Sequence, residues 1–155
     1  LTLMRDRGGE VARGEFMRWF AEAAWYPTAL LPSQGVHWEA VDERNARATA
    51  GEGALRVTLS FRFDDKGLIE SVRADARGRT EGGRVVQRAW EGRWADYQLH
   101  EGLLVPMSGE VAWLLPPQMG GRKVYWRGTV ETLRYERAGR SAQPDARVTP
   151  AAPAR

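Results

Sequence analysis

The alternation of hydrophobic and polar residues predicts mostly β-structure after Pro32. The clearest case is Leu55–Phe63, where every second residue is apolar and the residues between them are Arg, Thr and Ser. This alternation is typical of a strand with one buried face. The next residues, Asp-Asp-Lys-Gly at 64–67, have the composition of a hairpin turn. We expect an antiparallel meander of about seven strands in this part of the chain.

One segment before Pro32 has helical periodicity instead. From Gly14 to about Trp25 the apolar residues recur at intervals of three or four, which predicts an amphipathic helix that ends before Pro27. Further along, Gly109 interrupts an apolar row, which permits a bend or a bulge, and the apolar parity changes near Glu131, which suggests a bulge. Such irregularities would curve the sheet. The expected fold is α+β, mainly β: a curved, half-barrel-like antiparallel meander packed against one N-terminal helix.

The length of 155 residues is enough for one domain of ordinary size. We assign this domain to residues 14–136. Residues 1–13 are predicted to be a lead-in, for which a strand fragment is one interpretation. Residues 137–155 contain three prolines and no aromatic residue, which predicts a disordered tail or linker rich in Pro, Ala and Arg.

Charge and composition narrow the classes of partner. The net charge of +3 is carried entirely by residues 137–155, so the predicted domain is neutral overall and lacks the clustered positive charge that nucleic acid requires. The absence of cysteine excludes thiolate metal sites and thiol nucleophiles. No apolar run reaches the roughly 20 residues that span a bilayer, and no signal peptide is visible, which favours the cytoplasm. The oligomeric state is not indicated.

The seven tryptophans are the most unusual feature of the composition. Buried indoles supply large apolar area, so they either fill the space between helix and sheet or line a cavity for an apolar ligand. Our first hypothesis is a non-enzymatic domain that binds a lipid-like or apolar small molecule in this concavity. The residues predicted to bind it are Trp19, Trp25, Tyr26, Trp38, Trp94, Tyr97, Trp113 and Trp126, the tyrosines serving as polar handles.

A small acid/base enzyme is the alternative hypothesis. Asp96, Glu110 and Glu91 lie on predicted neighbouring strands beside apolar residues, where burial would raise a carboxyl pKa, and His37 is a further candidate. No catalytic-serine, dinucleotide-binding or metal-binding motif is present, so no cofactor or metal is predicted. A third hypothesis is a purely structural module of a longer protein, with sheet edges that pair with a missing part.

Several short runs, all within residues 14–136, resemble a family of uncharacterised bacterial domains of unknown function. The most specific is WYPTALLP at residues 25–32, and others are FRFD at 61–64, WEGRW at 90–94, VPMSGEVAW at 105–113 and YWRG at 125–128. Members of that family have a further segment before the helix. The resemblance implies membership of this family but no activity, because none is established for its members.

The chain is also similar, more loosely, to the LolA and LppX group of lipoprotein carriers. The similarity rests on the strand–turn–strand segment from Phe61 to Val72 and on the step from Gly102 to Pro106. In that group a half-barrel sheet and its helices enclose a hydrophobic cavity. This resemblance implies a site for an apolar ligand, by analogy of fold alone.

Overall fold

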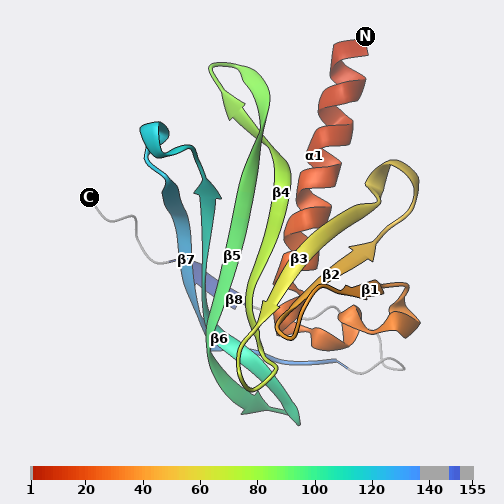
Figure 1. Cartoon of the computed structure of the whole chain (residues 1–155). Helices are drawn as coiled ribbons and strands as arrows, with labels where there is room; N and C mark the ends of the chain where they lie inside the picture. The colour runs from red at the N-terminus through yellow and green to blue at the C-terminus, as the bar shows by residue number, and fades with distance from the viewer. Residues whose placement is uncertain (1, 137–146, 151–155) are drawn as a thin grey trace.

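The computed structural model describes residues 2–136 and 147–150, with side chains for residues 9–136. It begins with a long helix, α1 (Thr2–Ala21), which runs along one side of the sheet (Figure 1). Short 3₁₀ turns follow at Glu22–Trp25, Pro27–Leu30 and Pro32–Gln34. Prolines open the second and third of these turns because their missing N–H is not needed in a first turn.

The described residues form a single open antiparallel sheet whose strand order follows the sequence. Each strand therefore pairs with the strand that comes next in the chain, as the alternation pattern predicts. The sheet is not closed into a barrel, and the term half-barrel remains a prediction. Its eight strands are β1 (His37–Ala40), β2 (Asn45–Ala50), β3 (Val57–Phe63), β4 (Ile69–Glu81), β5 (Arg84–His100), β6 (Leu103–Leu114), β7 (Arg122–Thr132) and β8 (Arg147–Pro150).

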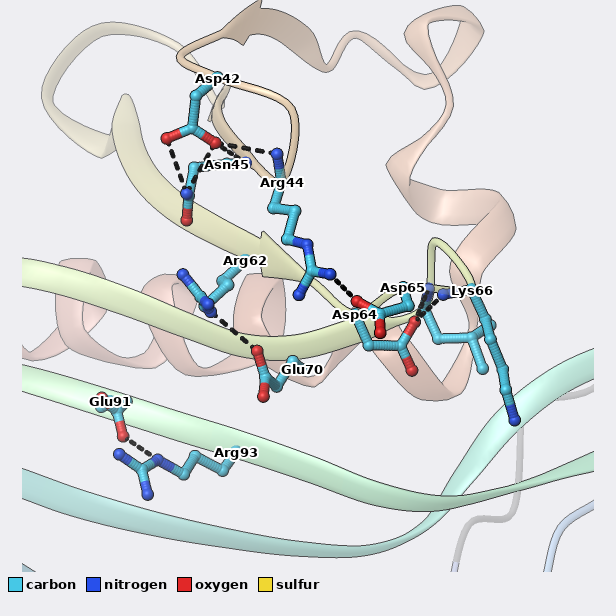
Figure 2. A network of polar contacts seen from close by, with 11 residues as sticks. Asp42, Arg44, Asn45, Arg62, Asp64, Asp65, Lys66, Glu70, Glu91 and Arg93 are labelled. Atoms are coloured by element: carbon cyan, nitrogen blue, oxygen red, sulfur yellow. Dashed lines mark hydrogen bonds and ion pairs between the residues drawn. The ribbon is translucent and has the colours of Figure 1, made fainter.

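Aspartates organise two turns of the meander, the one between β1 and β2 and the one between β3 and β4. The Asp42 carboxylate accepts the backbone N–H groups of Arg44 and Asn45 at 2.8 and 2.9 Å, and the Asp64 carboxylate accepts those of Lys66 and Leu68 (Figure 2). These hydrogen bonds satisfy backbone N–H groups of the turns that do not pair with a neighbouring strand. The hydrogen bond from Arg44 and then the Asn45 amide lower the pKa of Asp42. The hairpin predicted at residues 64–67 is confirmed by the pairing of β3 with β4.

The hydrophobic core lies between α1 and the face of the sheet that the helix covers. Phe20 is fully buried and meets Phe61 of β3 edge to face at 5.8 Å. Met17, Ala21 and Ala24 extend the same stripe of the helical segment and are buried with it. The predicted fold class, a mainly β structure with one N-terminal helix, is therefore confirmed.

Several predicted boundaries are wrong. The helix begins at Thr2, well before Gly14, so residues 2–13 are helical and contain no strand fragment; it ends at Ala21, after which the chain tightens into a 3₁₀ turn. Arg147–Pro150 of the predicted tail pairs with β7 as a strand. The other residues of the tail, 137–146 and 151–155, lie outside the described residues.

The two bulge predictions have different outcomes. The register shifts between Val130 and Thr132, which confirms an irregularity beside Glu131. Of the bend or bulge predicted at Gly109, the bulge is wrong: this residue stands in regular register opposite Trp94 on β5 and Gly128 on β7. Its missing side chain is required instead by the Trp94 ring, because a Cβ at position 109 would lie 2.4 Å from a ring carbon.

Candidate ligand-binding site

The structure places most of the predicted ligand-binding tryptophans in the core. Trp25 and Trp94 are buried and meet edge to face with ring centroids 4.8 Å apart, and Trp126 approaches Trp25 at 6.5 Å. Trp38 packs in the same manner against Phe61 at 5.0 Å. Edge-to-face contacts of this kind stabilise a packed interior, so these rings contact one another where a ligand was predicted.

Two of these indole N–H groups also have protein partners. Trp25 Nε1 donates to the carbonyl of Pro106, and Trp38 Nε1 donates to the carbonyl of Leu30, both at 2.8 Å. Trp94 Nε1 is buried without a hydrogen-bond acceptor among the described residues. A buried donor that is already satisfied is not available to orient a ligand.

Tyr26 and Tyr97 are used internally as well. Their hydroxyls donate to the carbonyls of Trp19 at 2.7 Å and Ile69 at 2.6 Å. Burial raises the pKa of both hydroxyls above the usual value of 10.0, and the Glu22 and Asp64 carboxylates raise the two pKa values further. Both tyrosines therefore remain protonated and hold the backbone rather than serving as free polar handles.

The acid/base candidates do not converge on one point. His37 is exposed on the edge strand β1, whereas Asp96 and Glu110 lie on β5 and β6. Asp96 is exposed and accepts a hydrogen bond of 2.5 Å from Ser108. No hydrogen bond joins any two of the three candidates in the part of the chain with described side chains.

Glu110 belongs instead to a row of ion pairs on the face of the sheet opposite α1. It contacts Arg122 at 2.7 Å and Arg127 at 3.0 Å, and Arg122 also contacts Glu91 at 3.1 Å. Burial alone would raise the Glu110 pKa, but the hydrogen bonds from Arg127 and Arg122 outweigh it and the pKa is lowered. Glu110 is therefore ionised at neutral pH, contrary to the raised pKa that a general acid needs. Figure 2 shows two further pairs, Glu91–Arg93 and Arg62–Glu70.

A cluster around Arg77 of β4 combines aromatic rings with a cation that forms no ion pair within residues 9–136. The guanidinium stacks over Trp90 at 4.8 Å and Trp113 at 5.7 Å, and it donates to the Tyr125 hydroxyl at 3.3 Å. That hydroxyl also accepts from Trp90 Nε1 at 2.8 Å. Trp113 stacks on Tyr125, which is 50% exposed. The cluster is thus fixed by cation–π and hydrogen-bond contacts and reaches the surface.

Arg77 Nε itself is buried and has no hydrogen-bond acceptor among the residues with described side chains. A buried donor left unpaired costs about 1–3 kcal/mol relative to a satisfied one. Arg79, two residues along β4, contacts Glu81 at 2.7 Å and does not share this deficit. The unpaired donor marks the position as a candidate for binding an anionic group.

A surface hollow of about 450 Å³ adjoins Arg77, between α1 and the hairpin of β4 and β5. Small-molecule sites have volumes of roughly 300–1,000 Å³. Its walls include two exposed valines, Val11 of α1 at 64% and Val85 of β5 at 45%. The complete lining is Glu10, Val11, Gly14, Glu15, Arg77, Gly78, Thr80, Gly83 and Val85.

A second hollow of about 520 Å³ lies over the opposite face of the sheet. Its charged side chains pair with groups of the protein itself: Glu110 with Arg127, Glu70 with Arg62 and Arg93 with Glu91. Polar groups that are already paired leave little to select a ligand. Trp94 also lines this hollow and its Nε1 has no acceptor among the described residues, but that donor is neutral and no large exposed apolar side chain accompanies it. The hollow beside Arg77 combines an unpaired donor on a charged group with two exposed valines, and is therefore the better candidate site. The second hollow is lined by Glu70, Arg93, Trp94, Ala95, Ser108, Gly109, Glu110, Arg127, Gly128 and Thr129.

The sequence gives little indication of this site. Ala74 and Arg77 share a face of β4 only because the register shifts between them; a bulge of this kind reverses the parity on which strand predictions rest. Glu10 and Val11 fall in the predicted lead-in, to which the sequence pattern assigns no helix. Of the predicted aromatic residues, Trp113 belongs to the Arg77 cluster. Trp19 is 44% exposed, stacks on Phe16 and is tilted against Tyr26.

Glu22, just after α1, is a further titratable group that the sequence did not single out. It is half-buried and contacts Arg18 at 3.4 Å. Burial raises its pKa above 4.5, the neighbouring Glu15 raises the pKa further, and the Arg18 and Arg77 charges oppose this increase. The net effect is a carboxyl group that is harder to ionise than an exposed one.

The described residues contain no group of three or more His, Asp or Glu side chains placed to hold a metal ion. None of the described helices is both long and apolar enough to cross a membrane.

The model of a family of unknown function, DUF6920, matches residues 1–135. The chain matches no curated protein and no solved structure, so the similarity to lipoprotein carriers remains a prediction.

Proposed function

We propose that this chain, which belongs to the family of unknown function DUF6920, binds a small molecule with an apolar part. The proposal rests on the geometry of the site. The proposed site is the hollow between α1 and the hairpin of β4 and β5. The proposal keeps the class of function predicted from the sequence and moves the site away from the core tryptophans.

The observation that carries the proposal is the exposure of two valines on the walls of one hollow. Val11 and Val85 come from elements far apart in the chain, yet both line a space of about 450 Å³. Val11 has most of its surface exposed, and Val85 has nearly half of its surface exposed. Isolated exposed valines need no explanation, but apolar side chains that share a concave surface are typical of ligand sites.

Fluorescence of a neutral lipophilic probe tests this proposal. N-phenylnaphthylamine is expected to bind the full chain, and Val85→Asp is expected to weaken binding by about tenfold or more, because a charged group would replace apolar wall. Leu99→Asp is the matched control: Leu99 is also an exposed apolar strand residue, but it is outside the hollow. Absence of probe binding, or equal loss in both variants, contradicts the proposal.

A further inference from the structure

Two unpaired charges of opposite sign line the same hollow. Arg77 has a buried Nε without an acceptor. Among the residues with described side chains, Glu10 accepts a hydrogen bond from one neutral group, the Gln87 amide, at 3.0 Å. Within residues 9–136, neither side chain forms an ion pair.

Glu15, the third charged side chain in the lining, is already paired, as is the neighbouring Arg79. Glu15 contacts Arg18 at 3.6 Å, and Arg79 contacts Glu81 at 2.7 Å. Arg77 and Glu10 are therefore the charges that a ligand would have to neutralise. An anion alone would meet the Glu10 carboxylate, and a cation alone would meet the Arg77 guanidinium, so each would be opposed by one wall of the hollow.

The backbone sets the spacing between the two charges. Glu10 and Gly14 are one turn apart on α1, about 6 Å along the helix axis. A Cβ on Gly14 would lie 3.7 Å from Arg77 Nε, and a Cβ on Gly78 would lie 3.1 Å from Glu10 Oε2. The glycines thus allow strand β4 and helix α1 to approach closely, and each charge lies next to one of them.

We propose that the hollow selects a zwitterionic amphiphile, with its oxyanion on Arg77, its cationic group on Glu10 and its apolar chain against Val11 and Val85. This inference rests on the proposed function. A guanidinium offers planar paired N–H donors that match a phosphate or carboxylate oxyanion, and the carboxylate of Glu10 attracts a quaternary or primary ammonium. The two head-group charges need a separation of roughly one helical turn.

Four probes with the same n-octyl chain test the head group: octylphosphocholine, octyl sulfate, octyltrimethylammonium and octyl glucoside. Isothermal titration of the full chain below each critical micelle concentration is expected to show the phosphocholine binding about tenfold or more tightly than the other three. Phosphocholine without a chain is expected to bind weakly, because it lacks the apolar contact. Equal binding of phosphocholine with and without the chain overturns the assignment of an amphiphile.

Charge-neutralising variants identify the residues. Arg77→Gln is expected to bind octylphosphocholine no more tightly than octyltrimethylammonium. Glu10→Gln is expected to bind octylphosphocholine no more tightly than octyl sulfate. Glu39→Gln and Arg47→Gln, exposed positions on β1 and β2, are expected to keep both preferences. Glu10 lies on a partly exposed helix position, so Glu10→Gln decides the question even where Arg77→Gln does not fold.

The outcomes separate the two proposals. If octyl glucoside and octylphosphocholine bind equally well, the zwitterion assignment is wrong and the apolar-ligand function stands. If neither the neutral probe nor any octyl ligand binds, both are wrong. Loss of the phosphocholine preference in Glu39→Gln or Arg47→Gln likewise overturns the assignment to Glu10 and Arg77.

Discussion

Gly109 shows how one small residue shapes the core. The Trp94 ring lies over this glycine, in the space that a side chain on β6 would otherwise occupy, and also contacts Gly92 on its own strand. This arrangement lets a large indole lie flat on the sheet and still meet Trp25 at 4.8 Å. The glycine is therefore required by packing, since its backbone stays in regular strand register.

Gly109→Ala is predicted to lower the free energy of unfolding by about 1–3 kcal/mol, because the new methyl group would force the Trp94 ring to move. Urea denaturation measures the change. Gly9→Ala is the control: a Cβ there would meet nothing within 4 Å, and alanine is favoured in a helix by up to about 1 kcal/mol. A Gly109→Ala variant as stable as the parent chain would show that the ring is placed elsewhere.

Glu22 gives a pH-dependent prediction. Its pKa is raised in the folded chain, mainly by burial. Ionising Glu22 therefore costs more free energy in the folded chain than in the unfolded chain. The stability of the parent chain therefore decreases as pH rises from the unfolded value near 4.5 through the raised folded pKa. Glu22→Gln removes this loss and is expected to raise the melting temperature at neutral pH.

The difference in melting temperature between Glu22→Gln and the parent chain is expected to vanish below about pH 4, because Glu22 is then protonated in both the folded and the unfolded chain. Thermal unfolding followed by circular dichroism across this range measures it. Glu52→Gln, at an exposed position, serves as the control and is expected to leave the pH profile unchanged. A Glu22→Gln variant that is less stable than the parent at neutral pH contradicts the assignment.

At the level of elements, the strands were easier to predict than the helix. Alternation identifies β3, because its polar positions reach water and its apolar positions reach α1. The first half of α1 has two adjacent glycines, Gly8 and Gly9, and few apolar residues, so it lacks the stripe that predicts a helix. β8 lies in a segment of low hydrophobicity, where strand formation comes from pairing with β7 rather than from an alternating pattern.

The orientation of α1 can be tested with two adjacent aromatic residues. Phe20→Ala is expected to cost about 3–5 kcal/mol, because a fully buried ring against Phe61 would leave a cavity. Trp19→Ala is expected to cost no more than about 1.5 kcal/mol, since Trp19 is 44% exposed and water can fill the space that its ring leaves beside Phe16 and Phe20. Equal costs in urea denaturation would mean that the helix presents a different face to the sheet.

At the scale of the whole molecule, the two faces of the sheet have different chemistry. One face is apolar and packs on α1, and the other carries ion pairs such as Arg127–Glu110. The sequence predicted this division through its period-two pattern. It could not predict the candidate site, because Val11 and Val85 are brought together only by the packing of α1 on the β4–β5 hairpin, and Arg77 is turned toward them by a bulge.

The most direct test of the account is to map ligand contacts by NMR on the full chain. Titration with n-octylphosphocholine is predicted to shift the backbone amides of Val11, Gly14, Gly78 and Val85, which surround the hollow, and to leave those of Arg93 and Arg127 on the opposite face unchanged. Shifts confined to the opposite face, or none at saturating ligand, would contradict the assignment of the binding site.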